Sequence, residues 1–282
     1  MKSRLLGLLG VAAVAAVGVT LLFGLRLPPT QEQDEYARLI AIHPAIAWVA
    51  YLAFGAMAVG SALYLLPATR ARRWDRLAAA SAEVGVVFCA LMLATGSIWG
   101  RPTWGVWWVW DARLTLSALM LALLLGYLAL RRAAVEPERR ALVSAIAGLA
   151  AVVVVPLNHF AVSWWRTLHQ GRSLARVSPQ SQLDAEYIQV MLVGFGAMTL
   201  AFAWLLVHRM RVEELEDAAA DQSLAVALEE RRREAVGVGA PVGPGDTGAP
   251  VGRGEHGTAG VGMGPHASEE TGVGAPVGQD EH

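Results

Sequence analysis

Long apolar runs, separated by short polar connections, occupy the chain from its start to about residue 211. A run of about 20 apolar residues forms a helix that crosses the hydrocarbon core of a bilayer. On this criterion we predict six membrane-spanning helices, at residues 5–25, 39–66, 77–98, 114–130, 141–159 and 187–208. The pattern therefore predicts an all-α integral membrane protein, a six-transmembrane-helix bundle with a tryptophan-rich outer loop.

The first apolar run has two interpretations. Lys2 and Arg4 precede an apolar core, as they do in a secretory signal peptide. That core, residues 5–25, has 21 residues without a charge, and no clean cleavage site follows it. Signal-peptide cores have about 7–15 residues, so we favour a retained helix.

Lysine and arginine in the short connections predict the orientation of the bundle, because cytoplasmic connections carry an excess of both. If the N-terminus is cytoplasmic, the inner side holds 12: Lys2, Arg4, Arg70, Arg72, Arg73, Arg76, Arg131, Arg132, Arg139, Arg140, Arg209 and Arg211. The outer side then holds 7: Arg26, Arg38, Arg101, Arg113, Arg166, Arg172 and Arg176. This bias predicts that both termini are cytoplasmic.

Beyond the membrane domain, residues 1–211, the composition changes twice. Residues 212–235 mix Leu, Val and Ala with Glu and Arg, which predicts a cytoplasmic surface helix. Residues 236–282 are rich in Gly and Pro, and the sequence GAPVG recurs there. Such a segment cannot bury enough apolar surface to offset its ordering entropy, which predicts a disordered tail.

The overall composition agrees with a membrane protein and excludes some other classes. Hydrophobic residues make up 55% of the chain and charged residues 17%, whereas soluble domains average about 25% charged residues. The net charge is -1, and no basic patch marks a nucleic-acid surface, so we predict no nucleic-acid partner. A single cysteine, Cys89, excludes an intrachain disulfide and a CxxCH haem-attachment motif.

Five of the ten tryptophans lie in residues 99–111, WGRPTWGVWWVWD. One interpretation is a belt at the membrane interface, with Asp111 as the N-cap of the fourth helix. A belt spreads its aromatic residues over many span ends, however, whereas these crowd into one connection. Gly100, Pro102 and Gly105 predict a shaped loop there in place of a helix. A flat aromatic surface for a flat ligand is the second interpretation, and we favour it.

Two histidines are predicted to lie on the same outer side as the tryptophans. His43 stands one turn into the second span, in AIHPAIAW, and His169 lies in the outer loop sequence WWRTLHQG. Either could be a structural histidine. Imidazole is also a normal axial ligand of haem iron, and a porphyrin is a flat apolar object that tryptophan faces would cover. Its carboxylates would need cations, and Arg101, Arg113, Arg166 and Arg172 lie on that side.

Two further polar residues have competing interpretations. His159, at the outer end of the fifth span, is a rival axial ligand to His169. Glu83 lies in the third span, where a carboxylate is costly. We expect it to be protonated, or paired with a serine or backbone group on a neighbouring helix.

At these residues the chain resembles a known family. WGRPTWGVWWVWDARLT is similar to the tryptophan-rich signature, or WWD motif, of the haem-handling membrane proteins of cytochrome c biogenesis. Within them, the six spans and WWRTLHQG resemble the cytochrome c maturation protein C family (CcmC), from about residue 36 to about 208. One departure is that Pro44 directly follows His43, where the family usually has one residue between them.

The resemblance implies that the protein binds haem b (iron protoporphyrin IX) on the outer face of the membrane, with His43 and His169 as axial ligands. The cofactor-binding residues that it implies are Trp48, Trp99, Trp104, Trp107, Trp108, Trp110, Asp111, Arg113, Trp164, Trp165 and Arg166. It implies a place in the bacterial cytoplasmic (inner) membrane with the haem site on the periplasmic side. The implied partners are the periplasmic haem chaperone CcmE, the ABC transporter subunits CcmA and CcmB, and the small membrane subunit CcmD.

In this interpretation the protein presents haem to CcmE in a lyase-like manner and is not a conventional turnover enzyme. Three alternatives remain open. One is a cytochrome c synthetase that attaches haem directly, although such proteins usually have more spans. Another is a haem transporter, for which Glu83 and Pro156 are the only weak signs of a polar or broken path. The last is a structural subunit that its tryptophans merely anchor in the membrane.

Overall fold

The computed structural model describes residues 2–30, 33–169 and 185–238 of the 282-residue chain. The chain divides into two units, residues 1–230 and 231–282. Everything below concerns the first unit. Of the second, the structure describes only the helical residues 231–238, so most of the predicted tail, 236–282, lies outside the described residues.

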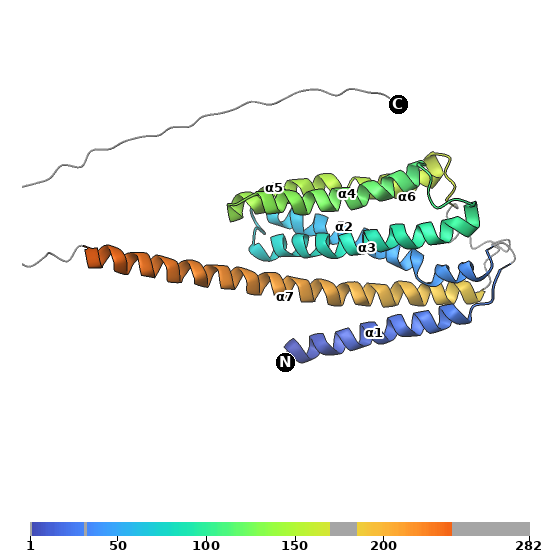
Figure 1. The fold of residues 1–282 in the computed structure, drawn as a ribbon, viewed down its shortest axis with the longest axis horizontal. Helices are drawn as coiled ribbons and strands as arrows, with labels where there is room; N and C mark the ends of the chain where they lie inside the picture. Colours follow the sequence, from blue (N-terminus) through green and yellow to red (C-terminus); the bar gives the residue numbers. More distant parts are fainter. Residues whose placement is uncertain (1, 31–32, 170–184, 239–282) are drawn as a thin grey trace, which may run out of the picture. The chain divides into compact units, whose positions relative to one another are not determined.

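The described residues are helical, and six helical segments among them are long and apolar enough to cross a membrane. The prediction of an all-α, six-span membrane protein is therefore confirmed. The helices are α1 (Lys2–Arg26), the 3-10 helix η1 (Glu35–Ala41), α2 (His43–Leu65), α3 (Arg72–Trp104), α4 (Ala112–Ala133), α5 (Pro137–Ala151), α6 (Val154–Trp164) and α7 (Ala185–Val238) (Figure 1).

The centre of the bundle is the contact between α2 and α3, against which α4 and α5 also pack. Phe54 and Met57 of α2 are fully buried there. The facing side of α3 carries alanines, which lets the two backbones approach closely. At Gly60, a Cβ atom would lie only 2.7 Å from the Trp74 carbonyl oxygen, so glycine permits this approach. Cys89 is buried in the same core.

Helices α1 and α7 run side by side, apart from the α4–α5 layer (Figure 1). Gly10 of α1 lies against the indole of Trp204 on α7. Gly194 of α7 lies against the carbonyl of Ala41, at the end of η1. These small residues hold α7 close to α1 and to the start of the second span.

Proline divides two of the predicted spans. The second begins as η1 and continues as α2, whose first residues are His43 and Pro44. Proline suits this position because its missing N–H has no helical partner there. His43 therefore opens α2, and it lies inside the second span, Glu35–Leu65, as predicted. The fifth span is interrupted between α5 and α6, where Pro156 cannot donate to the carbonyl of Val152.

The end of α3 differs from the sequence-based expectation. Gly100 and Pro102 were predicted to break the helix, but α3 continues through both to Trp104. Pro102 costs only one backbone bond near the helix end, and the Thr103 hydroxyl donates to the Trp99 carbonyl at 2.8 Å. Gly105 does end the helix, in the left-handed conformation (φ 78°), as expected of a glycine C-cap.

Helix α7 is continuous across residues 187–208, predicted as a span, and 212–235, predicted as a surface helix. No glycine or proline separates the two segments, so the helix does not end at the predicted boundary. Its side chains from Ala218 to Ala235 are exposed.

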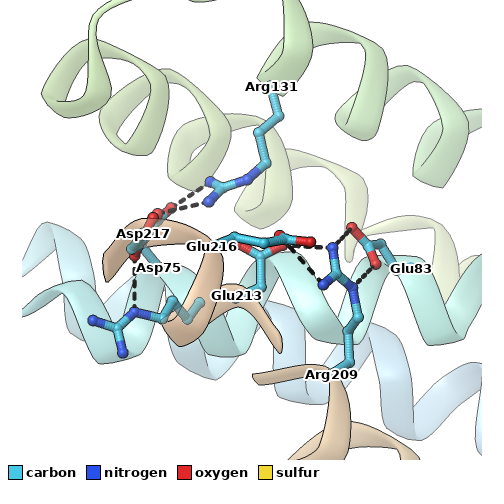
Figure 2. A network of polar contacts seen from close by, with 8 residues as sticks. Asp75, Glu83, Arg131, Arg209, Glu213, Glu216 and Asp217 are labelled. Carbon is cyan, nitrogen blue, oxygen red and sulfur yellow. Dashed lines mark hydrogen bonds and ion pairs between the residues drawn. The ribbon is translucent and has the colours of Figure 1, made fainter. Parts of the chain in front are cut away.

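Charged residues join α3 to both α4 and α7 (Figure 2). Arg131 of α4 donates twice to the carboxylate of Asp75 on α3, at 2.6 and 2.8 Å, and its side chain is 9% exposed. Arg76 of α3 donates to Asp217 of α7 at 3.1 Å. This end of the bundle is thus held by ion pairs between helices distant in the sequence.

Arg209 of α7 is the centre of the second group in Figure 2. It donates to both carboxylate oxygens of Glu83, and to Glu213 at 3.0 Å. The expectation for Glu83, protonation or pairing with a serine or backbone group, was therefore wrong. An arginine 126 residues away supplies the countercharge, and no local pattern identifies such a partner.

Replacing Asp75 by alanine should destabilise the bundle strongly, because it leaves the buried Arg131 guanidinium without its countercharge. We expect a loss of about 3–5 kcal/mol in the free energy of unfolding. Asp221→Ala is the matched control, since its pair with Arg72 is about two-thirds exposed on both sides and should cost no more than about 1 kcal/mol. Unfolding of the detergent-solubilised protein would measure both, and equal effects would contradict the prediction.

Candidate functional site

A large cavity of about 1150 Å³ lies between α2, α3, α4, α6 and α7, at the end of the bundle where α2 and α4 begin. Small-molecule sites usually measure about 300–1,000 Å³, so this one has room for a large ligand. Its lining includes seven residues that the sequence selected: His43, Trp48, Trp99, Trp104, Trp108, Arg113 and His169. The tertiary structure thus brings together both predicted histidines and part of the aromatic cluster.

His43 enters the cavity from the first turn of α2. Its Nδ1 lies 2.9 Å from the hydroxyl oxygen of Thr95 on α3, and that hydroxyl donates to the Leu91 carbonyl at 2.7 Å. We assign the hydroxyl hydrogen to the Leu91 carbonyl, the shorter of the two contacts, and this assignment makes Nδ1 the donor to Thr95. The lone pair of the imidazole is then on Nε2, which has no hydrogen-bond partner among the described residues.

Two tryptophans of the segment contact the predicted histidines. The Trp99 ring meets His43 edge to face, with centroids 5.7 Å apart, and its Nε1 donates to Gln33 at 3.0 Å. The Trp104 ring lies tilted against His169, with centroids 6.2 Å apart. Aromatic contacts of this kind restrict both imidazole rings.

Asp111 connects the two loops that carry these residues. Its Oδ1 accepts from the Leu114 backbone N–H at 2.8 Å, which confirms the expected N-cap of α4. Its Oδ2 accepts from the Leu168 backbone N–H at 2.9 Å, one residue before His169. One carboxylate therefore ends the tryptophan segment and also holds the His169 loop in place.

A polar network crosses one wall of the cavity. The Tyr51 hydroxyl of α2 donates to Asn158 of α6 at 2.5 Å, and the Asn158 amide donates to the Arg113 carbonyl and to Ser117 of α4. The Arg113 guanidinium donates to the Asn158 carbonyl at 3.2 Å, and its side chain lines the cavity. These bonds fix a positive charge beside an otherwise largely apolar space.

Helix α7 also contributes to the cavity wall. Trp48 of α2 donates from its indole nitrogen to Thr199 at 3.1 Å, and its ring meets Phe195 edge to face. Trp48 thus links the second span to α7 at the cavity.

The remaining selected residues lie elsewhere. Trp107, Trp110, Trp164, Trp165, Arg166 and Asp111 are not among the described residues that line the cavity. Trp110 is 77% exposed and Trp164 57% exposed, and Trp164 stacks on Phe160. Arg101 donates to the Gly105 carbonyl. Arg172, named as a possible cation, lies outside the described residues. The structure therefore divides the aromatic cluster into cavity-lining and outward-facing groups.

His159, the rival ligand, also lines the cavity. Its ring contacts Tyr51 and Phe160 edge to face, with centroid distances of 6.2 and 5.1 Å. Three histidines from α2, α6 and the following loop therefore face one space.

Sequence reasoning missed several lining or supporting residues: Gln33, Tyr51, Thr95, Ser117, Asn158 and Thr199. Asn158 could have been identified from the sequence, because an amide in an apolar span needs hydrogen-bond partners. Thr95 and Thr199 could not, since threonine hydroxyls in membrane helices commonly bond to the backbone of their own helix.

The arrangement is suited to a large, flat, anionic and metal-containing ligand. Tryptophan faces would cover apolar ring surface, imidazole Nε2 would bind a metal, and Arg113 would pair with a carboxylate. No group of three or more His, Cys, Asp or Glu suited to a bare metal ion occurs in the described part of the chain.

Comparison with known proteins identifies similar chains. The family described as CcmC, Heme exporter protein C, matches residues 1–225. The Heme exporter protein C of Haemophilus influenzae is 34% identical over 217 residues, 77% of this chain and 87% of that protein. The protein of the same name from Escherichia coli (strain K12) is 37% identical over 205 residues, 72% of this chain and 81% of that protein. A ccmC-like mitochondrial protein of Marchantia polymorpha, named for cytochrome c biosynthesis, is 36% identical over 149 residues, 53% of this chain and 62% of that protein.

Asp111→Asn should loosen the His169 loop. Asparagine has one acceptor oxygen, so it cannot both cap α4 and accept from Leu168. The lost bond to a charged acceptor is worth about 1.5 kcal/mol, or roughly a tenfold faster amide exchange at Leu168. Hydrogen exchange with mass spectrometry would measure this in the peptide that contains Leu168. Asp34→Asn is the control, since Asp34 makes no side-chain cap bond; unchanged exchange in Asp111→Asn would refute the link.

Proposed function

The chain belongs to the heme exporter protein C family, as its tryptophan segment predicted, and from this membership we propose that it binds haem b in the cavity and supplies it for cytochrome c biogenesis. The names of the relatives support a role in haem handling. The cavity supports it independently, because its size, aromatic lining and histidines fit a porphyrin.

The observation that carries the proposal is the state of His43. Its Nδ1 is hydrogen-bonded to Thr95, and with the proton assigned to Nδ1 the lone pair of Nε2 is left to a ligand. Metal-binding histidines almost always donate their second ring N–H to such an acceptor. A histidine that only stabilised the bundle would have no need to leave a polar atom unpaired beside a cavity.

His169 is the proposed second axial ligand, and the Asp111 bond to Leu168 supports it by holding the loop in place. Two axial bonds from separate elements would hold the iron between α2 and the loop after α6. His159 faces the same cavity and is the alternative second ligand. Trp104 and Trp108 would cover ring surface, and Arg113 would neutralise a propionate.

Presentation of haem to a partner follows as the finer part of the proposal. The protein would hold the porphyrin with a vinyl edge exposed to the nucleophilic histidine of the chaperone CcmE. CcmA, CcmB and CcmD would assist release. The outward-facing tryptophans, Trp107, Trp110, Trp164 and Trp165, stand around this end and are available to a partner or to lipid headgroups.

The proposed orientation places the cavity on the periplasmic side of the bacterial inner membrane and both termini in the cytoplasm. The distribution of lysine and arginine supports it. The ion pairs of Asp75–Arg131 and Arg76–Asp217 would then lie at the cytoplasmic end.

Haem binding should depend on the two proposed ligands. We expect the purified, haem-supplied protein to show a Soret band. His43→Ala and His169→Ala should each lose most of the haem, because each removes an axial bond. His208→Ala is the matched control, since His208 stacks on Trp204 and is outside the cavity lining. A wild-type protein without a Soret band would refute haem binding, and spectra unchanged by the two ligand substitutions would refute their assignment.

The two tryptophan groups should differ in their effect on haem. Trp104→Leu and Trp108→Leu should weaken haem binding about tenfold, because an aromatic contact is worth about 0.5–1.5 kcal/mol beyond its apolar area. Trp107→Leu and Trp110→Leu, matched controls from the same segment, should retain haem. Haem titration followed by absorbance would measure the four affinities. Equal losses in both groups would show that the cavity does not define the ring contacts.

A further inference from the structure

We propose that Thr95 is a positioning residue for haem ligation: its hydroxyl fixes the tautomer and orientation of the His43 ring so that Nε2 faces the cavity. The proposal rests on the proposed function, since it concerns the ligand His43. It assigns a role to a threonine of α3 that would not itself touch the iron.

The direction of the hydrogen bond follows from counting hydrogens. A threonine hydroxyl has one hydrogen, and here it points to the Leu91 carbonyl at 2.7 Å, with the Met92 carbonyl at 3.4 Å. The Nδ1 of His43, at 2.9 Å, therefore meets a lone pair of the oxygen and donates to it. In the opposite tautomer the proton would be on Nε2, where no acceptor occurs among the described residues.

The ring is also confined sterically, and by the same face of α3. A Cβ atom at Gly96 would lie 3.0 Å from Cε1 of His43, so glycine leaves just the space that the imidazole fills. The edge of Trp99 closes a further side of the ring. Thr95, Gly96 and Trp99 thus form a seat on α3 for a histidine carried by α2.

This seat has a chemical consequence for the bound metal. A hydrogen bond from Nδ1–H to an acceptor raises the basicity of Nε2, and such partners commonly change metal affinity about 10–100-fold. A more basic ligand favours ferric over ferrous iron. Thr95 should therefore increase the affinity for haem and lower its reduction potential.

Three variants test the proposal. Thr95→Val keeps the shape and removes the acceptor, whereas Thr95→Ser keeps the hydroxyl. Thr20→Val is the matched control, because the buried Thr20 hydroxyl donates to the Ala16 carbonyl in the same way but lies on α1, away from His43. We would measure haem affinity by titration, the midpoint potential by spectroelectrochemistry, and the His43 tautomer in haem-free protein by ¹⁵N NMR, assigned with His43→Ala.

The expected result is specific to the hydroxyl. Thr95→Val should bind haem about tenfold more weakly, with a raised midpoint potential and a loss of the Nδ1-protonated signal. Thr95→Ser and Thr20→Val should resemble the wild type in all three measurements.

Two outcomes would overturn the proposal, and they are distinguishable from failure of the proposed function. One is an NMR spectrum of the wild type, recorded without added haem, that shows His43 protonated on Nε2. The other is a Thr95→Val protein that binds haem with wild-type affinity and potential. If the folded wild type binds no haem at all, the proposed function fails and the role of Thr95 in ligation fails with it.

Discussion

Water is excluded from the hydrocarbon core of a bilayer, and this exclusion governs how the polar groups of the bundle are arranged. Each backbone polar group within a span must find its partner inside the protein, and most buried side-chain polar groups do so as well. Thr20, Ser81 and Thr95 accordingly bond to carbonyls of their own helices. Arg131 is buried only because Asp75 accepts from it twice. At the cavity, His43 has a hydrogen-bonding partner for Nδ1 but none among the described residues for Nε2, and its ring lines the cavity.

The two ends of the bundle are packed differently, and the cavity lies at one of them. Gly60 and the alanines of α3 let α2 and α3 approach at one end. At the other end, Asp111 joins two loops, and Asn158 joins α2, α4 and α6. A rigid frame of this kind holds imidazole rings in place before a ligand arrives, which reduces the ordering cost of binding.

The candidate site was partly predictable from the sequence. His43 and His169 were selected because they lie on the same predicted outer side and imidazole is a normal axial ligand of haem iron. The tryptophan segment was selected because five tryptophans in one connection are too crowded for an interfacial belt. Their division into cavity-lining and outward-facing groups was not predictable, because it depends on α3 continuing past Pro102 to Trp104. Thr95 and Thr199 were missed because a threonine in a membrane helix has a local partner in any case.

The six spans, the cap at Asp111 and the turn at Gly105 follow from local sequence, because each depends on hydrophobicity or backbone preference within one short segment. The pairing of polar groups follows instead from the packing of the helices. His43 and Thr95 are 52 residues apart, Asp111 and Leu168 57, and Glu83 and Arg209 126. Such pairs arise from the packing of whole helices, and no local pattern encodes them. The cavity is made of contacts of this second kind, and for that reason its wall, its fixed charge and the tautomer of its histidine appear only when the helices are assembled.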